Sequence, residues 1–218
     1  MKRRPLKIAI DGPSGSGKST LGRALARRLG LPYVDTGAMY RAVGWAVARA
    51  GLEEPPRIVE MLAGLRIEVE TDPDDFRVRV DGRDVTGELR DPKVGAMASR
   101  VATIEEVRAW LVPQQRRLAA EGGVVEGRDI GTVVLLDADA KFFLTSEENT
   151  RMARRAAQLG LDRAAPEVAG DVRERDRIDS NRRISPLRAA ADAVIIDTSD
   201  QTVEQSLAAI LAHIYASD

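Results

Sequence analysis

Short apolar runs alternate with stretches of helical periodicity along most of this 218-residue chain. The first run, 7–11, ends in a glycine-rich turn, and 19–29 then carries apolar residues at the spacing of an amphipathic helix. The same order, strand and then helix, recurs at 33–35 and 38–50. Further apolar runs short enough to be buried strands are 123–126, 141–144 and 193–197. Five buried strands with helical crossovers predict an α/β fold, a five-stranded parallel sheet with helices on both faces.

The segment 52–91 departs from this alternation, because it is acidic and contains a different strand pattern. It holds twelve acidic residues against six arginines. Within it, 66–70 and 76–80 alternate strictly between apolar and charged positions, as half-exposed antiparallel strands do. We therefore expect a single domain, 1–218, with an inserted antiparallel β subdomain at 38–100.

An arginine-rich region, 151–188, is predicted to be helical. It contains ten arginines and six carboxylates. Arg151, Arg154 and Arg155 share one helical face, a spacing that would let a hinged lid clamp donor phosphates. The alternative is that these arginines pair with carboxylates on a neighbouring surface. We assign 150–185 to a lid region.

The glycine-rich turn matches the pattern G-x-x-x-x-G-K-[S/T] between a predicted strand and a predicted helix. Its backbone N–H groups and the helix N-terminus favour bound phosphate. We expect Lys18 to reach the transferring phosphoryl group and the Ser19 hydroxyl to ligate Mg²⁺. The pattern predicts ATP binding and leaves the fate of the phosphate open. The predicted ATP-binding residues of this turn are Gly12, Ser14, Gly15, Ser16, Gly17, Lys18, Ser19 and Thr20.

Composition removes several kinds of chemistry. The chain has no cysteine and one histidine, which excludes disulfides, thiol nucleophiles and histidine triads. That histidine, His213, falls beside the apolar face of the last predicted helix and is expected at the surface. The net charge of −1 argues against a nucleic-acid polymer as partner, and no apolar stretch approaches the roughly 18 residues of a membrane span. We expect a cytoplasmic monomer that acts on small molecules.

The sequence Glu126-Gly127-Arg128-Asp129 places an arginine beside carboxylates near a strand end. A cation there suits an anionic acceptor better than a water nucleophile. A monophosphate acceptor has a second pKa of about 6, so its oxygen is already ionised at neutral pH and needs no general base. Arginine forks are suited to bringing two polyanions together. These features predict a small-molecule kinase.

Six segments carry a wider resemblance: 11–19, 35–41, 98–102, 107–108, 127–134 and 174–182. With them the chain resembles the bacterial cytidylate kinases, which are P-loop nucleoside monophosphate kinases, over nearly its whole length. The phosphate loop is shared with many families, whereas GRDIGTVV at 127–134 together with DTGAMYR at 35–41 is far more specific. The resemblance implies a P-loop NTPase-type three-layer fold and transfer of the γ-phosphoryl group of ATP to CMP or dCMP.

The same resemblance implies roles for four groups of side chains. Those that hold the acceptor phosphate are Arg41, Arg128 and Arg182, which together with Lys18 form the catalytic set. Those that recognise the cytosine edge are Ser99, Arg108 and Asp129. Those that bind the sugar hydroxyls are Arg175 and Asp179. Those of the lid that contact ATP are Arg151 and Arg155.

The side-chain chemistry of two acceptor-site positions, Asp129 and Thr36, bears on the choice of substrate. A carboxylate such as Asp129 accepts from the 4-amino group of cytosine and repels the oxygen that uracil presents there. Thr36, also assigned to the acceptor site, stands where the family often has serine; it keeps the hydroxyl and adds a methyl group.

Other interpretations remain open at this point. A kinase for UMP, AMP or shikimate could use the same core, and a P-loop protein could bind nucleotide as a signal without catalysis. An arbitrary arginine in so arginine-rich a chain is usually a solvated or salt-bridged surface group. Asp35 also suits the cap of the helix that begins near Gly37.

Overall fold

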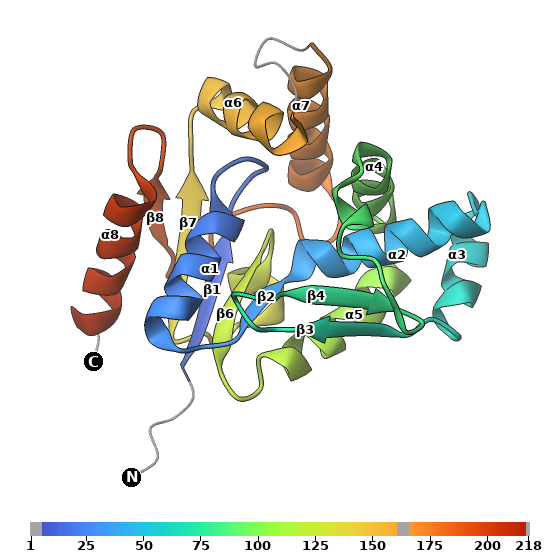
Figure 1. Cartoon of the computed structure of the whole chain (residues 1–218), viewed down its shortest axis with the longest axis horizontal. Helices are drawn as coiled ribbons and strands as arrows, with labels where there is room; N and C mark the ends of the chain where they lie inside the picture. The colour runs from blue at the N-terminus through green and yellow to red at the C-terminus, as the bar shows by residue number, and fades with distance from the viewer. Residues whose placement is uncertain (1–5, 161–165, 217–218) are drawn as a thin grey trace.

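A five-stranded parallel sheet forms the centre of the part of the chain described by the computed structural model, residues 6–160 and 166–216 (Figure 1). Its strand order is β2-β6-β1-β7-β8. The strands are β1 (Lys7–Asp11), β2 (Tyr33–Asp35), β6 (Gly123–Gly127), β7 (Ala140–Thr145) and β8 (Val194–Asp197). Each adjacent pair is parallel. The predicted α/β class and strand number are confirmed.

Helices cover both faces of the sheet because β1 alternates its buried side chains between them. Ile8 and Ile10 join an apolar cluster with α1 (Lys18–Leu29) and α8 (Val203–Ala216). Ala9, between them, faces the opposite cluster. That second cluster contains residues of η2 (Ile130–Val134) and is flanked by side chains of α5 (Glu105–Leu118). Side chains of successive strand residues point to opposite faces, so a sheet buried on both sides is apolar at every position.

The acidic segment forms a separate antiparallel sheet beside the parallel one. Register pairs such as Ile67 with Val80 and Val69 with Val78 confirm the predicted hairpin. A short helix that begins with two prolines precedes the hairpin, and the apolar pattern of the segment did not reveal it. The elements of this part are α2 (Thr36–Ala50), α3 (Pro55–Leu62), β3 (Ile67–Glu70), β4 (Arg77–Val80), β5 (Arg83–Asp84), η1 (Glu88–Arg90) and α4 (Pro92–Val101).

The hairpin shares its apolar core with the parallel sheet. The Tyr33 amide of β2 donates to the carbonyl of Thr71 at 2.8 Å. The rings of Tyr33 and Phe76 meet edge to face, with centroids 5.4 Å apart. Arg23 of α1 lies over both rings, at 5.0 and 5.4 Å from their centroids. The hairpin therefore packs on the main body, whereas helices α2, α3 and α4 share a second apolar cluster with α5.

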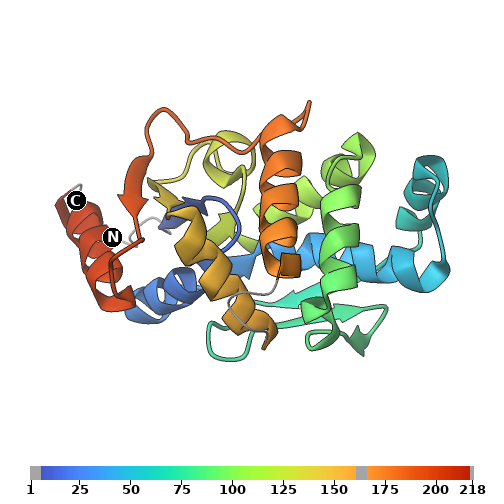
Figure 2. The same ribbon diagram turned by 90° about the horizontal axis from the view of Figure 1, so that it is seen from above.

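Two helices lie beyond the carboxyl ends of the central strands: α6 (Glu148–Leu159) and α7 (Pro166–Asn181). Both views place α7 beside α4 of the insert (Figures 1 and 2). The helical prediction for 151–188 is wrong after Asn181, because Ser185 adopts a φ of 53° directly before Pro186. Residues 161–165 of this predicted region lie outside the described residues.

The last helix, α8, buries one side and exposes the other. Ile210 and Ile214 pack into the main cluster. His213 is exposed, as predicted, and its ring meets Phe142 edge to face at 5.6 Å between centroids. Within 6–160 and 166–216, no helix combines the length and the apolar character needed to cross a bilayer.

The crossing of α2 and α4 generates a stability prediction. A Cβ atom on Gly44 would lie 2.8 Å from the backbone nitrogen of Ala98 and 3.2 Å from the carbonyl oxygen of Val94. Since both neighbours are backbone atoms, Gly44→Ala must push the helices apart, and we expect a loss of about 1 to 3 kcal/mol in the free energy of unfolding. Urea denaturation measures it. Gly64→Ala is the control, because a Cβ there meets nothing within 4 Å; equal losses in both variants would contradict the crossing argument.

Candidate active site

A cleft at the carboxyl ends of β1, β2 and β6 brings together side chains from six separate segments. It is closed on one side by α4 and on another by α6 and α7. In parallel sheets this edge is where ligands bind, because every strand there feeds a loop. The predicted site residues that line the cleft are Ser14, Gly15, Gly17, Lys18, Ser19, Thr20, Thr36, Arg41, Ser99, Arg128, Asp129, Arg155, Arg175, Asp179 and Arg182.

The phosphate loop and the first turn of α1 line this cleft. Gly15 and Gly17 have φ angles of 77° and 90°, which favour glycine. Gly17 caps α1 without a side-chain hydrogen bond, so the first turn of the helix keeps free donors for an anion. The Lys18 ammonium donates to the carbonyl of Pro13 at 2.7 Å. Burial, with Arg128 nearby, lowers the pKa of Lys18 to about 7.

Carboxylates hold the guanidinium groups of the acceptor side in place. Arg41 pairs with Asp35 at 2.7 Å. Asp35 also accepts from the amide of Ala38 at 2.9 Å, so the predicted helix cap is confirmed. Arg128 donates to Asp179 of α7 at 2.7 Å. Burial lowers the pKa of Arg128, but Asp179 more than compensates and the net pKa is raised.

Several buried donors in this region have no acceptor among the described residues. They are one guanidinium nitrogen each of Arg108, Arg175 and Arg182, the last of which lies 3.7 Å from an Asp179 oxygen, an ion pair beyond hydrogen-bond distance. Burial lowers the pKa of both Arg175 and Arg182. Buried N–H groups are almost always paired in native proteins, and an unpaired one costs about 1 to 3 kcal/mol. Because Arg175 and Arg182 line the cleft, the arrangement fits an anionic or oxygen-rich ligand there.

Arg108 and Asp129 form a buried ion pair at the inner end of the cleft. Their side chains are only 5% and 6% exposed. Asp129 lines the cleft, whereas Arg108 lies behind it, over the ring of Tyr40 at 5.5 Å from the centroid. The guanidinium therefore fixes the position of the carboxylate at the wall of the cleft through a charge-assisted hydrogen bond. Ser99, on α4, donates to the carbonyl of Gly95 at 3.3 Å.

Three of the predicted ATP-binding residues do not line this cleft. Gly12 packs against the carbonyl of Leu144, where a Cβ would clash. Ser16 lines a second pocket on the other side of the loop. Arg151 donates to the carbonyl of Ser14 at 3.2 Å and pairs with Asp176, so it supports the loop from behind.

The other arginines of α6 also have protein partners. Arg155 lines the cleft and pairs with Asp171 at 3.1 Å. Arg154 donates to the hydroxyl of Thr198 at 2.9 Å and lines the second pocket together with Gln201. Local sequence does not indicate this second pocket, because its walls come from the phosphate loop, α6 and the segment after β8.

Sequence reasoning assigned no role to Glu126 and only a helix cap to Asp35, although both carboxylates line the cleft. Glu126 of β6 is 2% exposed and accepts a hydrogen bond from the hydroxyl of Tyr33. Burial raises its pKa. Asp35 is its register neighbour on β2. A carboxylate at a strand end was visible in the sequence, but its contact with a tyrosine 93 positions away was not.

A parallel sheet with a phosphate loop between β1 and α1, facing a cleft lined with arginine, defines a P-loop kinase. The family model described as cytidylate kinase matches residues 8–216. A cytidylate kinase of Mycolicibacterium paratuberculosis is 49% identical over 205 residues, which cover 91% of this chain and 90% of that protein. One of Rhodococcus opacus is 47% identical, with 97% and 95% covered. The chain belongs to the cytidylate kinase family.

Solved structures bear on the fold alone. A crystal structure of an uncharacterized protein from Eubacterium ventriosum matches with a TM-score of 0.54 and 15% sequence identity. The match covers 97% of this chain and 99% of the other. The likeness supports the arrangement of the elements described above.

The buried ion pair generates a second prediction. Arg108→Met leaves the Asp129 carboxylate buried without a partner, so we expect a loss of about 3 to 5 kcal/mol in the free energy of unfolding. Urea denaturation at neutral pH measures it. Arg57→Met removes a cation from a pair exposed by 67% and 65%, and we expect at most about 1 kcal/mol there. Similar losses for the two variants would show that Asp129 does not depend on Arg108.

Proposed function

We propose that this protein transfers the γ-phosphoryl group of ATP to CMP or dCMP, yielding ADP and CDP or dCDP. One observation supports it most: Lys18 of the phosphate loop, Arg128 and the buried carboxylate of Asp129 face a single cleft. A donor anion, an acceptor anion and a cytosine amino group each find a complementary partner there. The names of the relatives agree with this substrate.

On the donor side, the phosphate loop receives the β- and γ-phosphates and Lys18 contacts the group in transfer. The second pocket, with Arg154 and Thr198, suits the remainder of the donor nucleotide. Mg²⁺ fits the oxygen donors of Ser19, Asp35 and Glu126, which line the cleft together. When bound, this ion neutralises charge on the phosphates. The described residues offer no cage of three or more acidic or histidine ligands, in keeping with an ion that retains waters.

On the acceptor side, Arg41, Arg128 and Arg182 hold the monophosphate in this proposal, which their position in the lining of the cleft supports. The acceptor oxygen is ionised at neutral pH, so the protein's task is positioning and charge stabilisation rather than proton removal. The Thr36 hydroxyl donates to the carbonyl of Glu126 at 2.7 Å, which keeps its methyl group at the cleft wall. Arg175 and Asp179 are placed for the sugar hydroxyls.

We also propose that the insert 38–100 binds the monophosphate and that 150–185 acts as a lid. The position of α7 beside α4 supports this (Figure 2), because both helices contribute residues to the lining of the cleft. Their approach would exclude water that could otherwise hydrolyse the γ-phosphoryl group. A cytoplasmic monomer remains our expectation.

The first functional prediction is an acceptor preference. With ATP and Mg²⁺, kcat/KM for CMP or dCMP should exceed that for UMP, AMP and shikimate by roughly tenfold or more, since a base-edge pair contributes about 1 to 3 kcal/mol. A coupled assay of ADP release measures it, and EDTA is expected to abolish it. A different preferred acceptor would support another kinase of this fold, and slow hydrolysis without acceptor dependence would support a nucleotide-binding regulator.

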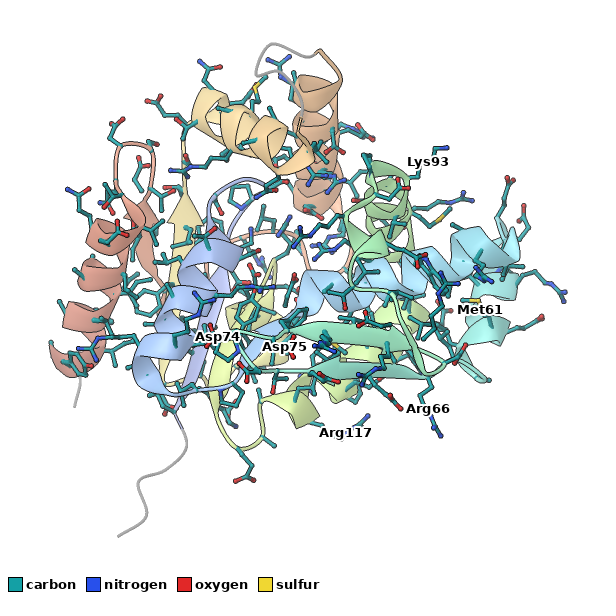
Figure 3. The ribbon with its side chains drawn as sticks, in the orientation of Figure 1. Met61, Arg66, Asp74, Asp75, Lys93 and Arg117 are labelled. Atoms are coloured by element: carbon teal, nitrogen blue, oxygen red, sulfur yellow. The ribbon has the colours of Figure 1, made fainter. Side chains whose placement is uncertain are left out.

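Asp129→Asn is predicted to lower the preference for CMP over UMP by roughly 10- to 100-fold, because an amide can also donate to the uracil oxygen. The KM for ATP is expected to stay within about twofold, since Asp129 contacts the acceptor end of the cleft. Asp75→Asn, at an exposed carboxylate of the hairpin turn (Figure 3), is the matched control. Unchanged selectivity in the Asp129 variant would remove this residue from base recognition.

A further inference from the structure

The segment after β6 adopts a single π-helical turn, η2, directly behind two of the proposed acceptor-binding residues. The carbonyl of Asp129 accepts from the amides of Val133 and Val134, at 2.9 and 3.2 Å. The amide of Leu135 donates to the carbonyl of Ile130, five residues back, at 2.7 Å. Such turns are rare and less regular than α-helices, and they occur often at functional sites. Side chains from outside the turn must therefore bond the free amides at its start and the free carbonyls at its end.

At the start of η2, one carboxylate caps two amides. Asp11 accepts from the amide of Ile130 at 2.7 Å with one oxygen and from that of Gly131 at 2.8 Å with the other. Its side chain is buried, and burial raises its pKa to about 6 although both hydrogen bonds lower it. Asp11 is the last residue of β1, and Gly12 after it opens the phosphate loop. The donor loop and η2 are therefore joined through this residue.

At the other end, one guanidinium group caps two carbonyls. Arg116 of α5 donates through Nε to the carbonyl of Val134 at 2.9 Å and through Nη2 to that of Val133 at 2.8 Å. A negative group at the amide end and a positive group at the carbonyl end both stabilise a helical turn. The same helix, α5, carries Arg108, which orients Asp129 from behind.

We propose that Asp11 and Arg116 are positioning residues that hold η2 from both ends and thereby aim Arg128 and Asp129 into the cleft. The proposal rests on the proposed function, because it concerns how the acceptor is held. Neither residue is assigned contact with substrate in this role. Each acts through the backbone of 128–134.

Arg116 offers the cleaner test, because it lies on the exposed side of α5 and its loss does not open the core. Arg116→Ala is expected to raise the KM for CMP about five- to tenfold while the KM for ATP changes less than about twofold, in line with the loss of charge-assisted hydrogen bonds. Arg116→Lys keeps one donor and restores part of the effect. The matched control is Arg117→Ala, since Arg117 is exposed and points away from the molecule (Figure 3).

A double variant distinguishes a loss of Asp129 orientation from a general weakening of acceptor binding. If Arg116 acts through Asp129, Arg116→Ala lowers the preference for CMP over UMP in the wild-type background and has no such effect when Asp129→Asn is already present. Asp11→Asn, which keeps only one acceptor oxygen, is expected to raise the KM for CMP more than that for ATP. Equal effects of Arg116→Ala and Arg117→Ala on every constant would overturn the proposal.

Hydrogen exchange tests, independently of catalysis, whether Asp11 and Arg116 hold the two ends of η2; we call this arrangement the clamp. The amides of 130–134 are expected to exchange at least about tenfold faster in Arg116→Ala than in the wild type or in Arg117→Ala, because opening of the turn is less costly. Unchanged exchange would overturn the clamp even in an active enzyme. A wild-type protein that ignores CMP and dCMP would overturn the proposed function instead, and the exchange result would still decide the clamp.

Discussion

Two mutually repelling phosphate groups must lie in line within one cleft from which water can be excluded, and the fold meets this constraint with charge at fixed positions. In the proposed function, the donor is held by backbone amides of the phosphate loop after β1 and by Lys18 at the start of α1. The acceptor is then held by guanidinium groups that come from α2, the end of β6 and the segment after α7. Fixed donors need no reorganisation when charge shifts during transfer, which is why rigid elements carry them.

Concentrating arginines in a buried cleft is costly, and the structure shows how that cost is offset. Asp35, Asp171 and Asp179 each pair with one or more of these arginines, at distances of 2.7 to 3.7 Å. Two of the arginines that keep a buried nitrogen without a hydrogen bond, Arg175 and Arg182, line the cleft. Removal of a carboxylate from such a set would disturb the guanidinium it orients as well as the local charge.

The central strands connect the two halves of the site mechanically. Asp11 ends β1, from which the phosphate loop departs, and the same carboxylate caps the turn behind Arg128 and Asp129. Glu126, one residue before Gly127, accepts a hydrogen bond from the hydroxyl of Tyr33 on β2. Donor and acceptor loops are thus attached to neighbouring strands whose spacing is set by their hydrogen bonds, and small shifts of one are transmitted to the other.

Local pattern was enough to predict the phosphate loop, the five buried strands, the antiparallel hairpin and the cap at Asp35. Each of these depends on interactions within a few residues: period-two burial, glycine in left-handed turns, or a carboxylate three positions before an amide. Wider motif resemblance supplied the acceptor residues, and the cleft contains nearly all of them. Only the tertiary structure decided that Arg151 supports the loop from behind and that Asp11 and Arg116 meet the two ends of η2. Those outcomes depend on partners far away in the chain, and no local periodicity records which distant carboxylate or carbonyl a side chain will meet.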